Sequence, residues 1–210
     1  MGLPQTTSKI SFDDYLAYER EEEARHEYFD GMIYAMAGES LEHSTISANL
    51  IGLLHGQLKG KPCRALSPNM KVLSGEYFPG QTHGLFSYPD ATVVCGEPKF
   101  HDERRDVLIN PTVIVEVLSP GTELFDRGEK FQRYRQQLDT LQDFVLVSSL
   151  YPLVELYQRQ PHGFWLYSAV AELDASVALP SIACDLLLLE LYDRVEFPAH
   201  SNPLPLGNGL

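Results

Sequence analysis

The sequence predicts an α/β fold in which a mixed β-sheet is flanked by helices and carries an added β-hairpin region. Residues 43–58 repeat apolar side chains at helical spacing, whereas residues 112–118 are dense in the β-branched residues of buried strands. The strand, helix, strand order that follows predicts a βαβ unit with a right-handed crossover. A chain of 210 residues with 44% hydrophobic content suffices for one such domain with a sizeable core.

The N-terminal part begins with a predicted helix over residues 11–27. Ser11 is placed to cap this helix, and the acidic residues of the first turn suit the positive end of the helix dipole. Asp30-Gly31 is a turn signal, and residues 32–36 are typical of a strand that starts after it. We therefore expect a helix and then a short hairpin or crossover.

The middle of the chain adds a second helix and two strands. The apolar face of the helix at 43–58 should pack against a sheet. Strands are expected at 69–73 and 91–95, and the Gly- and Pro-containing stretch between them, 74–89, predicts a hairpin with an irregular loop. A charged loop at 97–106 leads to the next strand.

The C-terminal half contains the best candidate for a central strand, residues 112–118. A helix at 127–139 and a buried strand at 143–147 should follow it. Residues 153–167 predict a hairpin, and the apolar stretch 186–191 should pack back onto the body of the domain.

The domain is expected to span residues 11–197, with an N-terminal tail at 1–10 and a flexible, proline-containing C-terminal tail at 198–210. No apolar run approaches the roughly 20 residues of a membrane span, and the first residues lack the hydrophobic core of a signal peptide. The sequence therefore predicts a soluble, cytoplasmic protein without a membrane partner.

The three cysteines, Cys63, Cys95 and Cys184, lie far apart and form no Cys-x-x-Cys pair. This spacing suggests neither a zinc cluster nor a disulfide framework. We expect reduced thiols, mostly in the core.

The formal net charge of −13 is the opposite of the electrostatic footprint of a nucleic-acid binder. The distribution is uneven, however, because residues 13–42 hold most of the N-terminal acids, whereas Arg127, Lys130, Arg133 and Arg135 cluster in one later segment. This pattern is compatible with a local basic face on an acidic protein.

Glu116 is a carboxylate in the middle of an apolar strand. Because side chains alternate between the two faces of a strand, Glu116 shares its face with Ile114 and Leu118. An ionised carboxylate there costs several kcal/mol unless it is paired or bound to a metal. The alternative to a functional site is a buried ion pair or a strand end near solvent.

Asp90 opens the strand at 91–95, and it can meet Glu116 at the edge of the sheet if the two strands are neighbours. Alone, the Pro89-Asp90 pair is a common turn signal. Two converging carboxylates repel each other unless a cation lies between them, and such oxygen ligands suit Mg²⁺ or Mn²⁺. The pair therefore predicts divalent-metal chemistry, which suits phosphodiester hydrolysis.

Several short motifs occur in a fixed order, and they are Pro89-Asp90, Val115-Glu116-Val117-Leu118-Ser119-Pro120, Asp126-Arg127, Lys130 and Tyr134. Together they resemble the Uma-two family, a bacterial group of nucleases with the PD-(D/E)xK restriction-endonuclease fold, over about residues 10–195. The resemblance implies a restriction-endonuclease-like mixed sheet. It also implies that Asp90 and Glu116 bind the metal, with the backbone carbonyl of Val117 as a further ligand.

One position departs from the superfamily pattern, in which a lysine follows the acid by two residues. Leu118 stands there, and it can neither stabilise charge nor activate water. Lys130, one turn before Tyr134, is the expected substitute, because some members of the superfamily carry this lysine on a neighbouring helix. The alternative is a lysine on a solvated helix face.

Four further residues are candidates for accessory roles. The resemblance implies that Glu27 points into the same site to hold a second metal or water, and a solvated glutamate is the alternative. His43 could be a phosphate contact, a proton carrier or only a helix-start residue. Arg127 is a candidate for phosphate contact and Tyr134 for core packing.

The leading hypothesis is an Mg²⁺- or Mn²⁺-dependent endonuclease that cleaves DNA, with Asp90 and Glu116 as metal ligands and Lys130 as the catalytic cation. The alternative is a non-catalytic nucleic-acid-binding or protein-interaction module that retains the nuclease fold. A hydrolase of another phosphodiester or nucleotide would use the same site. By analogy with nucleases of this fold, a homodimer is expected.

Overall fold

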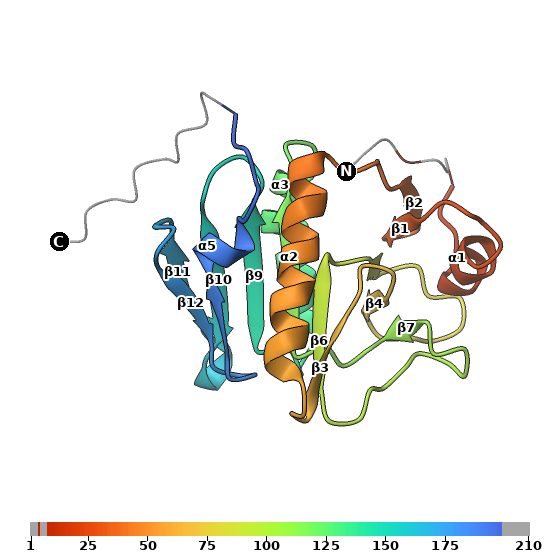
Figure 1. Cartoon of the computed structure of the whole chain (residues 1–210). Helices are drawn as coiled ribbons and strands as arrows, with labels where there is room; N and C mark the ends of the chain where they lie inside the picture. Colours follow the sequence, from red (N-terminus) through yellow and green to blue (C-terminus); the bar gives the residue numbers. More distant parts are fainter. Residues whose placement is uncertain (1–3, 5–7, 199–210) are drawn as a thin grey trace.

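The computed structural model of the chain describes residue 4 and residues 8–198 (Figure 1). Its helical segments are α1 (Phe12–Glu19), α2 (Leu41–Leu58), α3 (Glu123–Phe125), the π-helical turn η1 (Asp126–Lys130), α4 (Phe131–Gln137), the 3₁₀ turn η2 (Pro161–Gly163) and α5 (Leu188–Leu191). Its strands are β1 (His26–Phe29), β2 (Met32–Ala35), β3 (Cys63–Leu66), β4 (Lys71–Ser74), β5 (Leu85–Ser87), β6 (Ala91–Cys95), β7 (Val107–Leu108), β8 (Val113–Leu118), β9 (Asp143–Ser148), β10 (Val154–Arg159), β11 (Trp165–Val170), β12 (Ser176–Leu179) and β13 (Cys184–Leu187).

A six-stranded mixed sheet in the order β11-β10-β9-β8-β6-β3 forms the centre of the fold. Within it, β8 lies between β9, which runs parallel to it, and β6, which runs antiparallel. The chain passes from β8 to β9 through α3, η1 and α4, so the predicted strand, helix, strand unit is confirmed. Every residue of β8 is buried, as expected for the central strand.

Alternation along β8 divides the core into two layers. The odd-numbered valines of Val113–Leu118 pack in the same cluster as α2, whereas Ile114 and Leu118 pack with the aromatic and aliphatic residues of α4. Figure 1 shows α2 lying along one face of the six-stranded sheet. Glu116 therefore leaves β8 on the face that α4 covers.

A second sheet, in the order β2-β1-β5-β4-β7, lies beside the first and is covered by α1 (Figure 1). The predicted turn joins β1 to β2 in an antiparallel hairpin, and Asp30 and Gly31 have the positive φ angles (47° and 97°) of a two-residue hairpin turn. The predicted strands at 32–36 and 69–73 correspond to β2 and β4. The hairpin carries Glu27 toward the central sheet.

The first helix is shorter than the sequence predicts, because α1 ends at Glu19 and residues 26–29 form β1. The predicted cap is confirmed, since the Ser11 side chain takes part in a capping box. A continued helix would place Glu22 and Glu23 three and four residues after Glu19, where like charges repel, and the hairpin pairing of β1 stabilises the strand. Glu27 therefore lies on a strand and not near the end of a helix.

The predicted helix at 127–139 is divided into three parts. It begins earlier, in α3, passes through the wider turn of η1 and continues as α4. A π-helical turn accommodates one extra residue without ending the helix, and such turns are frequent at functional sites. Here the turn brings both Asp126 and Lys130 to the buried side.

The cysteine prediction is wrong for two of the three residues. Cys63 and Cys95 face each other as partners in the β3–β6 pairing, and their sulfurs form a disulfide across 32 residues of sequence. Cys184 is a free, buried thiol as expected. β3 is a short edge strand without strong alternation, so the sequence does not predict it. The register that brings the two sulfurs together is therefore not predicted either.

The C-terminal part confirms the predicted hairpin, which is β10 paired with β11. The strand β12, which was not predicted, pairs with β13, and Leu186, Leu188 and Leu191 pack in the same cluster as α2. The predicted tails at 1–10 and 198–210 lie mostly outside the described residues. Among the described residues, no helix is both long and apolar enough to cross a bilayer.

Candidate functional site

A cavity of about 620 Å³ opens where the two larger sheets meet the N-terminus of α2 and the η1 turn. Most of the predicted site residues line this cavity, and they are Glu27, His43, Asp90, Glu116, Val117 and Lys130. The other two candidates, Arg127 and Tyr134, are absent from its wall.

Glu116 lies at the floor of this cavity and is 3% exposed. Its Oε1 accepts a hydrogen bond of 2.9 Å from the Tyr134 hydroxyl, which also contacts the Ser87 hydroxyl at 2.8 Å. Tyr134 is fully buried, so its predicted packing role is confirmed. The tyrosine also fixes the orientation of the Glu116 carboxylate.

Lys130 is buried among three carboxylates. Its Nζ lies 2.9 Å from Glu27 Oε1, 3.1 Å from Asp126 Oδ1 and 3.4 Å from Glu116 Oε1. The lysine is only 5% exposed, and Glu27 is buried as well. Neither residue therefore belongs to the solvated surface that was the alternative for each.

The electrostatics of this group are dominated by burial. Burial raises the pKa of Glu116 well above its usual range, and the nearby Asp126, Asp90 and Glu27 add to this rise while Lys130 opposes it. For Lys130, burial alone would lower the pKa, but the surrounding carboxylates outweigh it and raise the pKa. The lysine is therefore a fixed cation at neutral pH.

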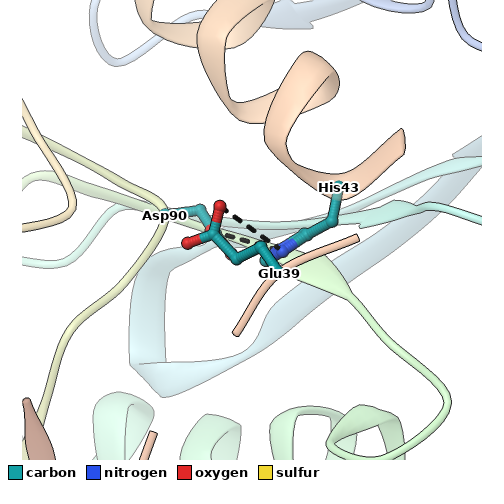
Figure 2. Close-up of side chains that lie close together, drawn as sticks. All are labelled: Glu39, His43 and Asp90. Carbon is teal, nitrogen blue, oxygen red and sulfur yellow. Dashed lines mark ion pairs between the residues drawn. The ribbon is translucent and has the colours of Figure 1, made fainter. Parts of the chain in front are cut away.

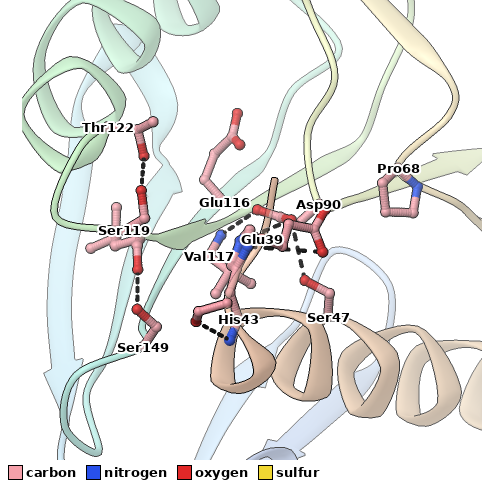
Figure 3. A network of polar contacts seen from close by, with 12 residues as sticks. Glu39, His43, Ser47, Pro68, Asp90, Glu116, Val117, Ser119, Thr122 and Ser149 are labelled. Carbon is pink, nitrogen blue, oxygen red and sulfur yellow. Dashed lines mark hydrogen bonds and ion pairs between the residues drawn. The ribbon is translucent and has the colours of Figure 1, made fainter. Parts of the chain in front are cut away.

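Asp90 stands at the start of β6, beside Glu116, because β6 and β8 are neighbours. Its Oδ2 accepts a 2.7 Å hydrogen bond from the Val117 backbone N–H, and its Oδ1 accepts one of 3.2 Å from the Ser47 hydroxyl (Figure 3). These bonds fix the carboxylate at the edge of the central strand. In Figure 3 the Glu116 side chain extends away from this group.

His43 approaches Asp90 from the first turn of α2, whose N-cap is Ser40. Its Nε2 lies 3.2 Å from Asp90 Oδ1 but outside hydrogen-bond geometry, so the contact is electrostatic. Its Nδ1 lies 4.0 Å from Glu39 Oε2. Burial opposes protonation of His43, but the two carboxylates outweigh burial and raise its pKa.

Figure 2 shows the side chains of Glu39, His43 and Asp90 converging on one point. Each offers a ligand atom, and these atoms lie within 4.8 Å of one another. The cavity wall as a whole is acidic, because among the described residues its carboxylates outnumber its lysine and arginine side chains by six to two. Oxygen donors in excess of cations suit a hard divalent cation such as Mg²⁺ or Mn²⁺.

The expected basic face is not formed by the described side chains, because most of the clustered cations are neutralised by acids. Arg135 lies over the Phe131 ring instead. The pairs are Arg127 with Glu123 and Glu155, Arg133 with Asp30, and Lys130 with its three carboxylates. Arg127 is thus held by two glutamates outside the cavity, away from the phosphate contact suggested for it.

Three site residues were missed by sequence reasoning. Asp126 contacts Lys130 four residues later, and Glu39 and Ser47 flank His43 at four-residue intervals. Spacing of this kind on a helix is a recognisable signal for residues that share a face. The signal was hidden because Asp126 falls in a π-helical turn and Glu39 precedes the helix cap.

The mixed sheet, with an acidic cavity at the end of its central strand, has a counterpart among solved structures. A crystal structure described as a putative nuclease belonging to DUF820 from Anabaena variabilis superposes with a TM-score of 0.69 at 21% identity, covering 88% of this chain and 98% of that one. This likeness shows that the two chains share the same mixed α/β fold.

The chain belongs to the Uma2 family, whose model is described as a putative restriction endonuclease and matches residues 12–188. Two proteins of Synechocystis sp., both described as uncharacterized, are similar over most of their length. The protein slr1290 is 37% identical over 185 residues, 85% of this chain and 91% of that protein. The protein sll1609 is 30% identical over 177 residues, 84% of this chain and 96% of that protein. The resemblance stated from the motifs is thus confirmed, and the family implies a nucleic-acid substrate.

Proposed function

We propose that this protein is an Mg²⁺- or Mn²⁺-dependent endonuclease that hydrolyses phosphodiester bonds of DNA. The observation that carries the proposal is the 3.4 Å contact between Lys130 and Glu116. The position of the usual motif lysine holds Leu118, which is buried in the core. Lys130, which lies in η1, would supply the positive charge that Leu118 cannot provide from the strand.

The metal would be held by Asp90, Glu116 and the carbonyl of Val117, with Glu39 and His43 as further donors beside Asp90. A bound divalent cation would polarise the scissile phosphate and lower the pKa of a coordinated water. Ligands that are already oriented by neighbouring groups bind a metal with less reorganisation. The hydrogen bond from the Val117 N–H supplies this orientation for Asp90, whereas the Glu116 carboxylate is held by Tyr134 and extends away from Asp90 (Figure 3).

The remaining groups would act on the phosphate and on protons. Lys130 would stabilise the negative charge that develops on the phosphate oxygens, and Glu27 and Asp126 keep its ammonium protonated and in place. His43 is the candidate for carrying a proton, because it is a titratable group beside Asp90 on the cavity wall. Arg127 has no part in this scheme.

The test measures cleavage of plasmid and branched DNA in Mg²⁺ and in Mn²⁺. Asp90→Ala and Glu116→Ala should each lower the cleavage rate by at least about 100-fold, because the metal loses a ligand. Lys130→Met should lose activity to a similar extent, and Lys130→Arg should retain more. Glu97→Gln, a change at an exposed acid outside the cavity, is the matched control.

Cleavage that is unchanged in both alanine variants would contradict the proposal. A second candidate, a nucleic-acid-binding module without turnover, is favoured by the apolar Leu118 at the motif position. It predicts DNA binding by the wild-type chain with no cleavage in either metal. Metal binding is measured separately by calorimetry, so loss of catalysis can be distinguished from loss of the cation.

A further inference from the structure

We infer that the cavity accepts a single strand of nucleic acid, with one base stacked on Tyr34, in preference to an intact duplex. This inference rests on the proposed nuclease function and names the substrate class of that same site. It is carried by the depth of the site, by one partly exposed aromatic ring and by the shortage of available cations.

The reacting groups lie deep. Glu116, Asp126 and Lys130 are 3%, 2% and 5% exposed, and all three line the cavity. The cavity has a volume of about 620 Å³, within the roughly 300–1,000 Å³ typical of pockets that hold small ligands. A pocket of this size takes about one nucleotide at its buried groups, and a paired, stacked duplex must pay a few kcal/mol to release one, whereas a single strand does not.

Tyr34 provides a surface on which a base can stack. It pairs directly with Glu27 across the β1–β2 hairpin, so the two side chains share one face of the sheet. Both line the cavity, and Tyr34 is partly exposed. Among the described residues, the Tyr34 side chain makes no hydrogen bond or ring contact, and its backbone is paired in the hairpin. A base stacked on this ring would hold the adjoining phosphate near Lys130, the partner of Glu27.

The cations of the wall are too few for a duplex. Lys130 serves the reacting phosphate and is already paired with three carboxylates, so Arg25 is the other lysine or arginine among the described lining residues, and its Nη2 lies 3.9 Å from Glu39 Oε1. Its Nη1 donates to the Pro68 carbonyl at 3.1 Å, and its guanidinium lies 5.6 Å from the centre of the Tyr88 ring. An arginine has five N–H donors, so donors remain for one phosphate. Duplex affinity instead requires many neutralised phosphates.

The experiment measures fluorescence anisotropy of short labelled oligonucleotides with the full chain. Turnover is blocked by Glu116→Gln in every sample, and Mg²⁺ is present throughout. The probes are a single-stranded DNA, the same sequence as RNA, and a blunt DNA hairpin. We expect both single strands, DNA and RNA, to bind more tightly than the hairpin. Tyr34→Leu should weaken single-strand binding by about 5- to 150-fold, whereas Tyr34→Phe should retain it, because stacking on an aromatic ring is worth ~1–3 kcal/mol per base.

Two further variants define the contacts. Arg25→Gln should weaken binding and reduce the slope of log affinity against log salt by about one, as expected for one lost phosphate contact. Tyr77→Leu removes a tyrosine that is 46% exposed outside the cavity wall, and it should leave affinity unchanged. Thermal unfolding of each variant verifies that the fold is retained.

The inference is overturned if the hairpin binds as tightly as the single strands, if no probe binds, or if Tyr34→Phe and Tyr34→Leu lose affinity equally. A different result would show that the proposed nuclease function is wrong while the single-strand preference holds. In that case the wild-type chain binds single strands with the expected dependence on Tyr34 but cleaves none of them in Mg²⁺ or Mn²⁺. If the protein cleaves intact duplex and this cleavage does not depend on Tyr34, the proposed nuclease function stands and the preference for single strands is wrong.

Discussion

At the scale of single residues, the candidate site is a set of buried charges that compensate one another. Lys130 satisfies Glu116, Glu27 and Asp126 together, and Asp90 is satisfied by the groups around the start of α2. Leaving one buried charge without its partner is far more costly than an exposed substitution. Burial raises the pKa of Glu116 even beside Lys130, so a further cation bound here would favour the ionised carboxylate.

The stability of the protein should therefore depend on the ionisation of Glu116. Because the folded-state pKa of this carboxyl is raised, mainly by burial, its ionisation disfavours folding. Wild-type stability is greatest below the ordinary glutamate pKa of about 4.3 and falls as pH rises from there toward the raised value. Glu116→Gln removes this pH-dependent loss, so in EDTA the difference in unfolding free energy between the variant and wild type should shift in favour of the variant as pH rises.

Urea unfolding between acidic and mildly alkaline pH measures this difference. Glu97→Gln, at an exposed position, should show a constant difference from wild type. Adding Mg²⁺ should stabilise wild type but not Glu116→Gln, because only the folded wild-type site retains the ligand. If the difference in unfolding free energy between Glu116→Gln and wild type does not change with pH, the raised pKa of Glu116 is wrong.

At the scale of elements, the site depends on how η1 enters α4. Sequence periodicity predicts one uniform helix there, because Phe131, Tyr134 and Leu138 do lie on one apolar stripe. The π-helical turn changes the phase of the helix before that stripe begins, so Asp126 and Lys130 are buried together. The positions of apolar residues within α4 carry no information about this turn.

Deleting Gly128 should convert the π-helical turn into an α-helical one. Asp126 and Lys130 would then be three residues apart and not four, which shifts the carboxylate relative to the ammonium while both remain on one face of the helix. We expect the cleavage rate of the proposed nuclease to fall by about 10- to 100-fold, because small misplacements of catalytic groups are costly. Single-turnover cleavage assays with saturating enzyme measure this effect.

Gly128→Ala is the matched control, because it keeps the length of the turn. A Cβ at this exposed glycine meets no atom within 4 Å. Alanine should leave the cleavage rate unchanged and raise the free energy of unfolding by about 0.5–1 kcal/mol. Equal activity of the deletion and alanine variants would show that the π-helical turn does not position the site.

At the scale of the whole molecule, long-range pairing decides which distant segments meet. The disulfide joins β3 to β6 at the end of β6 remote from Asp90, and the N-terminal hairpin delivers Glu27 to a site on the central sheet. The chain has a formal net charge of −13, and the cavity wall is acidic as well, because its acids outnumber its lysine and arginine side chains among the described residues. A homodimer, expected from other nucleases of this fold, stays a prediction.

The disulfide should stabilise the oxidised protein. For a loop of 32 residues, the chain-entropy model gives about 3–4 kcal/mol, which a reducing agent should remove. Urea unfolding with and without the reductant measures this difference. The double variant Cys63→Ala/Cys95→Ala should be insensitive to the reductant, while Cys184→Ala, which removes the buried free thiol, should respond like wild type. A reductant effect that persists in the double variant refutes the assignment.

The sequence by itself determined the mixed α/β fold, the central strand and the position of the Glu116 carboxylate among apolar residues of that strand, because these follow from local periodicity and burial. Motif order also pointed to Lys130, which contacts Glu116, and predicts Asp90 as a second metal ligand. Only the tertiary structure decided the register of β3 against β6, the short first helix and the joining of Asp126 and Glu27 around Lys130. These features depend on contacts between residues distant in sequence, and their energies are absent from any local pattern.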